Sequence, residues 1–263
     1  MDRKDLKLPF TLQKPNDWAC PTCRTGMLHI KKDTFHAHET LISRKQASFD
    51  GWGPEDTQYV YSCTLVCKND QCKETVSCAG VGGVELNEIN DENDESDEPH
   101  ESYDDYFLPK FFEPHLRLTN IPEKCPESVS KPLNESFGLF FSSPSAASNN
   151  VRMAIEELLT ELKIRRYNLV KNERRFMSLN QRINLLPLKF SQLKDLILAI
   201  KWLGNAGSHA SGKVSMDDVM DSYDLIEHVL HEIYAPKTKK LAALAKQINK
   251  KEGPLKRKTK LSF

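Results

Sequence analysis

The chain has 263 residues, of which 39% are hydrophobic and 28% charged, and its formal net charge is zero. This length suits two modest domains, and the apolar content is typical of a globular protein. No uninterrupted apolar run reaches the roughly 18 residues of a membrane span, and no apolar core of a secretory signal follows the first residues, so we expect a cytoplasmic protein with no membrane segment.

The neutral total conceals strong local charge. Residues 85–109 carry eleven Asp or Glu and no Lys or Arg, whereas residues 237–263 carry ten Lys or Arg and one acid. Residues 163–182 carry seven Lys or Arg and one acid. A partner would therefore meet local fields that the net charge does not reveal.

A small β domain is predicted for residues 1–84. Four segments in it are rich in β-branched or aromatic residues and are bounded by turn signals: 27–30, 35–43, 58–67 and 74–82. Residues 85–106 are predicted to be an acidic loop or linker, because so charged a segment cannot be buried. Residues 107–132 are rich in proline and are predicted to form an extended strap, in which Phe111 and Phe112 are expected to be buried.

The period of the hydrophobic pattern becomes helical after this strap. A compact helical bundle is predicted for residues 133–236, with helices expected at 133–141, 146–162, 191–204 and 215–234. Ser191 is the expected N-cap of the third helix and Gly204 its C′ residue, and the fourth begins with a Ser-x-x-Asp capping pattern at Ser215. The basic tail, residues 237–263, is expected to be flexible. The predicted fold class is therefore α+β.

Two cysteine pairs have the spacing of metal ligands. Cys20 and Cys23 form a C-P-T-C knuckle, and Cys67 and Cys72 form a looser C-x4-C pair after a predicted strand. Four thiolates on two turns predict a tetrahedral structural zinc in a zinc-ribbon-like domain, with no open position for water.

The other cysteines and two histidines are weaker ligand candidates. His36 and His38 alternate on a predicted strand and could replace a thiolate, or are simply exposed strand residues. Cys63, Cys78 and Cys125 are interpreted as small apolar fillers.

Several motifs occur in a fixed order between residues 18 and 235: the CPxC knuckle, the C-x4-C pair, "IPE" in the strap, "VRMAIEELL", "QRI" and "KWLGNAGSH". In this order they resemble the bacterial family called domain of unknown function 4145, which is similar to the HEPN superfamily of helical domains. Many HEPN domains are metal-independent ribonucleases of toxins, phage defence and CRISPR-linked systems. The resemblance implies a HEPN-like bundle of four or five helices that forms a homodimer.

The resemblance also implies a candidate catalytic site at His209. HEPN nucleases carry an arginine, then four to six residues, then the histidine, whereas this chain has no arginine at that spacing and has Lys201 eight positions and Asn205 four positions before His209. In RNA cleavage His209 would be the acid or base, Lys201 the electrostatic stabiliser and Asn205 the orienting group. In the alternative interpretation Gly204 ends the helix, His209 binds the exposed carbonyls, and Trp202 is a core residue.

The basic segment at residues 163–182 is a candidate nucleic-acid interface, because cations interleaved with Tyr167 and Phe176 are typical of surfaces that bind RNA. Its candidate contacts are Arg165, Arg166, Lys171, Arg174, Arg175 and Arg182. Alternatively the segment is a solvated loop whose arginines pair with Glu156, Glu157 and Glu161.

We therefore expect a cytoplasmic module that binds RNA or another phosphorylated ligand without robust catalysis, in a phage-defence setting that only the resemblance suggests. One alternative is a HEPN-type endoribonuclease. The other is a structural subunit whose zinc ribbon and strap contact a protein partner. The sequence has no phosphate-binding P-loop, dinucleotide-binding glycine motif, HExxH motif or serine elbow, which leaves nucleotide hydrolysis, redox and protease functions without support.

Overall fold

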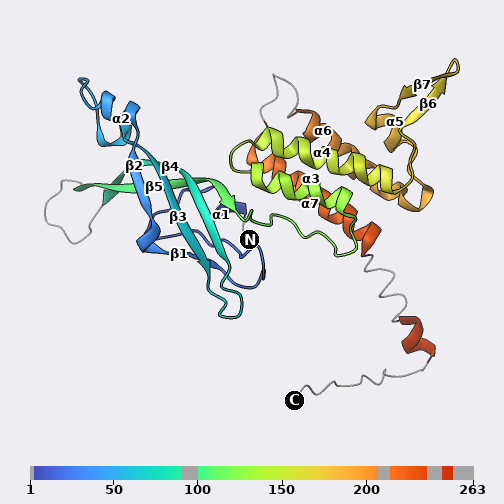
Figure 1. Ribbon diagram of the computed structural model, residues 1–263, viewed down its shortest axis with the longest axis horizontal. Coiled ribbons are helices and arrows are strands. Elements are labelled where there is room, and N and C mark those ends of the chain that lie inside the picture. Colours follow the sequence, from blue (N-terminus) through green and yellow to red (C-terminus); the bar gives the residue numbers. More distant parts are fainter. Residues whose placement is uncertain (1–2, 90–99, 207–213, 236–244, 251–263) are drawn as a thin grey trace.

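The computed structural model describes residues 3–89, 100–206, 214–235 and 245–250. The fold is α+β, as predicted: an antiparallel sheet is followed by a helical half (Figure 1). No helix in these ranges is long and apolar enough to cross a membrane.

The sheet and its connections occupy the N-terminal half. A short helix, α1 (Arg3–Lys7), precedes it, and the strands are β1 (Leu28–Ile30), β2 (His36–Glu39), β3 (Gln58–Cys67), β4 (Thr75–Ile89) and β5 (His100–Glu113), with helix α2 (Leu41–Gln46) between β2 and β3. The strand order is β1-β3-β4-β5, and β2 pairs with the same edge of β3 as β1, one after the other. Alternate residues of β3, among them Tyr61, Cys63 and Leu65, are buried, because successive side chains of a strand point to opposite faces.

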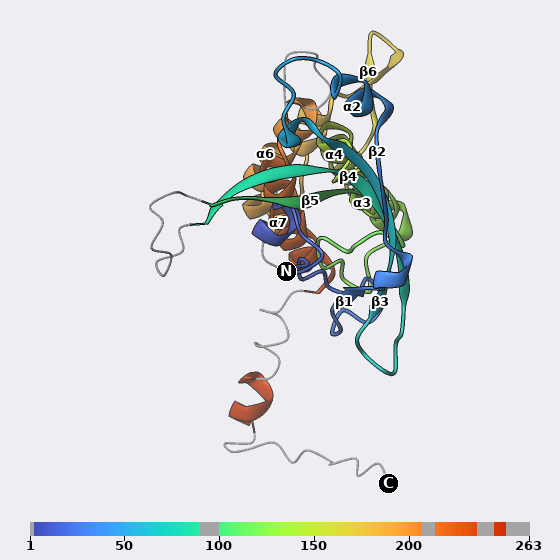
Figure 2. The same cartoon turned by 90° about the vertical axis from the view of Figure 1, so that its left-hand side faces the viewer.

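The predicted acidic linker is largely strand. β4 continues to Ile89 and β5 begins at His100, so that residues 85–89 and 100–106 form a two-stranded arm that extends from the sheet (Figures 1 and 2). Such an arm needs no buried face, because the strands satisfy each other's backbone groups while charged side chains such as Glu85, Asp104 and Asp105 are exposed. High charge therefore excluded burial but did not exclude a strand.

The predicted strap is shorter than residues 107–132. Residues 107–113 belong to β5, an edge strand that tolerates Pro109, and the alternation of the strand buries Phe112 while leaving Phe111 45% exposed. At the other end, helix α3 begins at Glu127 and includes Pro132, whose ring is buried in the core. The irregular strap therefore spans residues 114–126.

Four main helices form the C-terminal half. They are α3 (Glu127–Leu139), α4 (Pro144–Glu161), α6 (Lys194–Ala206) and α7 (Met216–Tyr234), with the short α5 (Leu179–Ile183) between α4 and α6. The predicted apolar faces meet in the interior, where Ile155, Leu158, Ile197 and Ile200 have no exposed surface. A further helical segment is described at residues 245–250.

The capping pattern predicted at Ser215 is confirmed. The Ser215 hydroxyl accepts a hydrogen bond from the Asp218 N–H at 3.2 Å, and the Asp218 carboxylate accepts one from the Ser215 N–H at 2.8 Å. This reciprocal pair satisfies two backbone donors that the helix itself leaves free.

The predicted ends of the third helix are wrong. A 3-10 segment, η3 (Leu188–Leu193), includes Ser191, and α6 begins only at Lys194 and passes through Gly204 to Ala206. A Cβ atom at Gly204 would lie 2.5 Å from the Cβ of Arg152 on α4. Gly204 is therefore placed by the close approach of two helices, not by a left-handed helix end.

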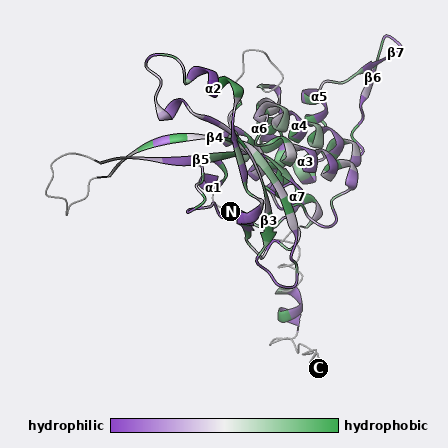
Figure 3. Ribbon diagram, turned by 60° about the vertical axis from the view of Figure 1, so that its left-hand side comes forward, coloured by the Kyte–Doolittle hydropathy of each residue, from purple (hydrophilic) through white to green (hydrophobic). Residues whose placement is uncertain are grey.

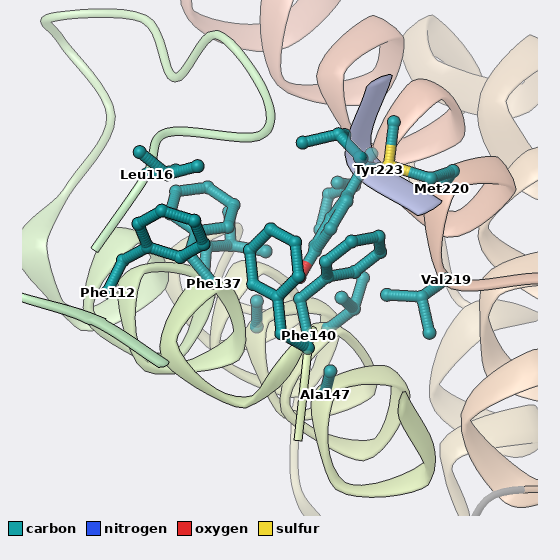
Figure 4. Packing of buried hydrophobic residues seen from close by; sticks show 14 of the residues in the cluster. Phe112, Leu116, Phe137, Phe140, Ala147, Val219, Met220 and Tyr223 are labelled. Atoms are coloured by element: carbon teal, nitrogen blue, oxygen red, sulfur yellow. The ribbon is translucent and has the colours of Figure 1, made fainter. Parts of the chain in front are cut away.

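One continuous core joins the sheet to the bundle. Phe112 of β5 packs against Phe141, which follows α3, with ring centroids 4.9 Å apart, and Leu116 of the strap is 1% exposed (Figure 4). Tyr223 of α7 lies in the same cluster. Ion pairs from α1 to α7 add to this contact, for example Lys7 to Asp217 at 2.6 Å.

Candidate metal centre and candidate nucleic-acid interface

The structure brings together the four cysteines that the spacing singled out. The sulfur atoms of Cys20, Cys23, Cys67 and Cys72 all lie within 4.8 Å of one another. The Sγ–Sγ distance is 3.7 Å between Cys20 and Cys72 and also 3.7 Å between Cys23 and Cys67. Such a cluster of thiols could bind a metal ion through four protein ligands.

The first cysteine pair is positioned by a tight turn. The N–H of Cys20 donates to the carbonyl oxygen of Gly26 at 2.8 Å, and the N–H of Gly26 donates to Cys23 Sγ at 3.3 Å. Arg24, inside the turn, has a φ of 60°. A Cβ at Gly26 would lie 2.4 Å from Cys67 Sγ, so only glycine allows the two pairs to approach this closely.

The second pair lies on the turn between β3 and β4. The N–H of Asn69 donates to Cys67 Sγ at 3.4 Å, and the N–H of Cys72 donates to the carbonyl oxygen of Asn69 at 2.9 Å. Lys73 completes the turn with a φ of 50°. Each turn thus directs a backbone N–H at a sulfur atom, which favours the thiolate form that metal ions bind.

The thiols differ in their electrostatic environment. The backbone N–H of Gly26, followed by hydrogen bonds from Thr25, lowers the pKa of Cys23 to about 5. Burial raises the pKa of Cys67 to about 12. A cation among the four sulfurs would stabilise all four thiolates together and reverse the effect of burial.

The weaker ligand candidates lie outside this cluster. His36 and His38 are exposed on β2, in agreement with the interpretation that they are exposed strand residues and not metal ligands. Cys63 and Cys78 face each other across β3 and β4 and are both buried, whereas Cys125 is half-buried.

The basic segment is a β-hairpin and not a loop. Its strands are β6 (Tyr167–Val170) and β7 (Glu173–Phe176), joined by Lys171 and Asn172 with φ angles of 50° and 61°. Two consecutive residues with positive φ give the turn whose twist matches a two-residue hairpin. The hairpin stands away from the bundle (Figures 1 and 3). The sequence signal for this hairpin was the pair Lys171–Asn172 between residues 167–170 and 173–176.

Its cations divide into two groups. Arg166 pairs with Glu157 at 2.7 Å, as the alternative interpretation predicts, and Arg175 pairs with Glu173 at 3.2 Å. In the described ranges Arg165, Lys171 and Arg174 make no ion pair, and the Arg174 guanidinium lies 3.9 Å from the centroid of the Tyr167 ring. The hairpin therefore presents three cations that no described carboxylate neutralises.

Arg182 was wrongly predicted as a surface contact. It is 4% exposed and donates to the Glu156 carbonyl oxygen at 3.1 Å and to Thr160 Oγ1 at 2.9 Å. Burial, followed by the nearby Arg166, lowers its pKa. Arg182 fastens α5 to the end of α4, and its place in a short amphipathic helix beside the buried Ile183 was the signal that the sequence interpretation missed.

The candidate catalytic residues are not brought together by the described part of the chain. Lys201 is 9% exposed and its ammonium lies 3.5 Å from the centroid of the Trp202 ring. Trp202 is 61% exposed, so its alternative interpretation as a core residue is wrong. Asn205 lies in the last turn of α6, and His209 lies outside the described residues.

Two domain families match the chain in series. Residues 8–112 match "Domain of unknown function (DUF8608)", and residues 134–251 match "Domain of unknown function (DUF4145)". No curated protein and no solved structure shows significant similarity to the chain. The resemblance to DUF4145 was expected over residues 18–235, which is too wide at its start. The four cysteines lie in the part of the chain that matches DUF8608. The chain is thus similar to DUF8608 over its sheet and to DUF4145 over its helical half.

Proposed function

We propose that this protein is a zinc-stabilised module that binds RNA through its β6–β7 hairpin and lacks robust catalysis. The observation that carries the proposal is a set of three cations without an ion pair in the described ranges, Lys171 and Arg174 on a projecting hairpin and Arg165 just before it, beside the exposed ring of Phe176.

Zinc is the ion that best fits the cysteine cluster. Four sulfurs at about 2.3 Å from a tetrahedral zinc lie about 3.8 Å from one another. The two Sγ–Sγ distances of 3.7 Å agree with this edge length. Because all four ligands come from the protein, no position is left for a reacting water, and the ion's role is to hold the turns of the N-terminal half.

Three features of the hairpin suit single-stranded RNA. Its unpaired cations offer charge for phosphates, and Phe176 is 75% exposed with its ring centroid 4.3 Å from that of Tyr167. Unpaired bases can stack on such aromatic faces and on guanidinium planes, whereas the bases of a double helix are not available for this contact. A shallow hollow of about 800 Å³, lined by Arg165, Arg166, Tyr167 and Arg174 among others, lies along the hairpin.

The environment of Lys201 supports our proposal that the protein lacks robust catalysis. A cation that is 9% exposed and lies over an indole ring is not open to a phosphate backbone without rearrangement. The setting that we propose, a HEPN-like homodimer in a bacterial cytoplasm with a part in phage defence, comes from the resemblance described above; the matched family DUF4145 is itself a domain of unknown function.

RNA affinity as a function of salt tests this proposal. Fluorescence anisotropy with a labelled, unstructured RNA would compare the wild-type chain with the double variant Lys171→Asn/Arg174→Gln. Asn suits the left-handed backbone of position 171. We expect the wild type to bind more tightly at low salt, and the variant's salt slope to be smaller by about 0.7 for each phosphate that it no longer binds. Arg44→Gln/Lys45→Gln removes the same charge from the exposed helix α2 and should leave the affinity unchanged.

The same samples separate the alternatives. No binding at low salt, or equal weakening by the α2 control, would contradict the hairpin interface. RNA fragments that disappear with His209→Ala would replace the proposal with a ribonuclease. Neither binding nor cleavage would favour a structural subunit with a protein partner.

A further inference from the structure

A groove separates the cysteine knuckle from the end of helix α7. It has a volume of about 770 Å³, within the range of small-ligand sites, and lies between the two halves, where such sites are common. Three separate parts of the chain line it: the turn that holds Cys20 and Cys23, the strap, and the last turn of α7. We call it the domain groove, and its lining residues are Arg24, Arg117, Asn120, Ile121, Pro122, Glu123, Lys124, His231, Tyr234 and Ala235.

Hydrogen bonds hold the knuckle side of the groove in place. Arg24 donates through Nη1 to Asn120 Oδ1 at 2.8 Å, and the N–H of Asn120 donates to Glu227 Oε2 at 2.8 Å. The same carboxylate oxygen accepts a bond from Thr119 at 2.7 Å. Arg24 is therefore oriented by the strap, and the strap by α7, so this guanidinium is positioned before any ligand arrives.

The groove carries an excess of positive charge. Arg24, Arg117 and Lys124 line it with one acid, Glu123, and none of the three cations makes an ion pair within the described ranges. By contrast, Arg152 pairs with Glu156 at 2.5 Å and Arg166 pairs with Glu157 at 2.7 Å. A guanidinium with free donors in a hollow suits a phosphate group, which it can bind through two parallel hydrogen bonds.

Apolar residues form much of the remaining lining, beside His231. Ile121, Pro122 and Ala235 line the groove together with the ring of Tyr234. Burial raises the pKa of Tyr234 to about 12, so its hydroxyl stays a neutral donor at physiological pH. This hydroxyl is buried and has no hydrogen-bond partner in the described part of the protein. A ligand that joins a phosphate to a flat, partly polar body would use both sides of the groove.

We propose that the domain groove binds the phosphate of a nucleoside phosphomonoester, with Arg24 and Arg117 on the phosphate and the strap wall against the base. Such a group is found on a free mononucleotide and on the 5′ end of an RNA. The site goes beyond the proposed function, since it uses none of the hairpin residues.

Calorimetric titration of the metal-loaded full chain with adenosine 5′-monophosphate tests the site, with adenosine as the probe without phosphate. The variants are Arg24→Asn, chosen because the left-handed backbone of position 24 accepts asparagine, and Arg117→Gln, with Arg44→Gln as the matched control. We expect saturable binding of the monophosphate but not of adenosine, weakened at least about tenfold by either groove variant and unchanged in the control. Metal content should stay at the wild-type value in Arg24→Asn.

Two RNAs of equal sequence, with a 5′-phosphate or a 5′-hydroxyl, identify the source of the phosphate. The measurement uses the hairpin variant Lys171→Asn/Arg174→Gln, so that failure of the hairpin proposal leaves this result intact. Preference for the 5′-phosphate assigns the groove to RNA ends, and no preference assigns it to free nucleotides. The inference is overturned if the monophosphate does not saturate the protein, or if it binds the groove variants as well as the wild type; the cations would then only complement the negative end of α7.

Discussion

Arg182 is a buried cation that holds the short helix α5 against the end of α4. Counted as charge, it belongs with the six other cations of residues 163–182; in the structure it is buried and bound to the end of α4. Burying a guanidinium is costly unless its donors find acceptors, and Nη1 and Nη2 of Arg182 find them, whereas its buried Nε has no partner in the described part of the chain. Position along the chain could not separate Arg182 from Arg174, because the difference lies in what each side chain contacts.

Replacing Arg182 should therefore cost stability and not RNA affinity. Arg182→Met keeps the apolar stem but leaves the Glu156 carbonyl oxygen and Thr160 without this donor, and we expect a loss of about 1–3 kcal/mol in the free energy of unfolding. Urea denaturation measures it. The exposed Arg165→Met is the matched control and should change stability by less than about 0.5 kcal/mol. Equal stability of the two variants would contradict the structural role.

At the scale of elements, short-range patterns were dependable and long-range placement was not. The capping box at Ser215 and the apolar faces of α4 and α7 depend on residues three or four positions apart, and all were predicted. The acidic arm of β4 and β5 was not predicted. Its two strands pair with each other on either side of residues 90–99, and their sequences lack the alternation of apolar and polar residues that indicates a strand. Gly204 was wrongly predicted to end the helix. A glycine is needed there because Arg152 of α4 approaches it closely, and the sequence of α6 contains no sign of this contact.

The capping box should make the start of α7 sensitive to acid. Hydrogen bonds from the Ser215 hydroxyl and then from its backbone N–H hold the pKa of Asp218 below its usual range. A carboxylate with a lowered pKa in the folded state stabilises the fold above its unfolded pKa of about 4, and this stabilisation is lost as the pH falls further.

Thermal unfolding between pH 7 and pH 3 measures the effect. The difference in Tm between the wild type and Asp218→Asn should be largest at neutral pH and should shrink below about pH 4. Asp50→Asn, at an exposed acid far along the chain, should show no such trend. A difference that does not change with pH would exclude the carboxylate as its source.

For the whole molecule, the continuous core implies that the cysteine cluster and the bundle unfold together. Trp18 precedes the first cysteine pair and is 1% exposed, and its ring packs at 5.2 Å from Phe112, which in turn contacts Phe141 beside α3. The sulfur cluster is thus connected to the bundle through aromatic contacts and not through a flexible linker.

Removal of the proposed zinc should accordingly lower the stability of the helices as well as of the sheet. Ligand binding to the folded state adds stability by mass action, so a chelator should lower the Tm of both the helical signal at 222 nm and the near-ultraviolet signal of the aromatic core. Both should shift by the same amount and recover with added zinc. A helical transition that ignores the chelator would show that the halves unfold separately.

Local features were decided by the sequence alone: the spacing within each cysteine pair, the capping box, the helical faces and the α+β class all depend on residues close together in the chain, where backbone geometry sets the spacing. Other features were decided only by the tertiary structure: the burial of Arg182, the glycine contact between α4 and α6, and the domain groove, where Arg24 meets Asn120 of the strap. The physical reason is that burial, close approach and charge pairing are set by residues far apart in the chain, and these distances exist only once the core has formed.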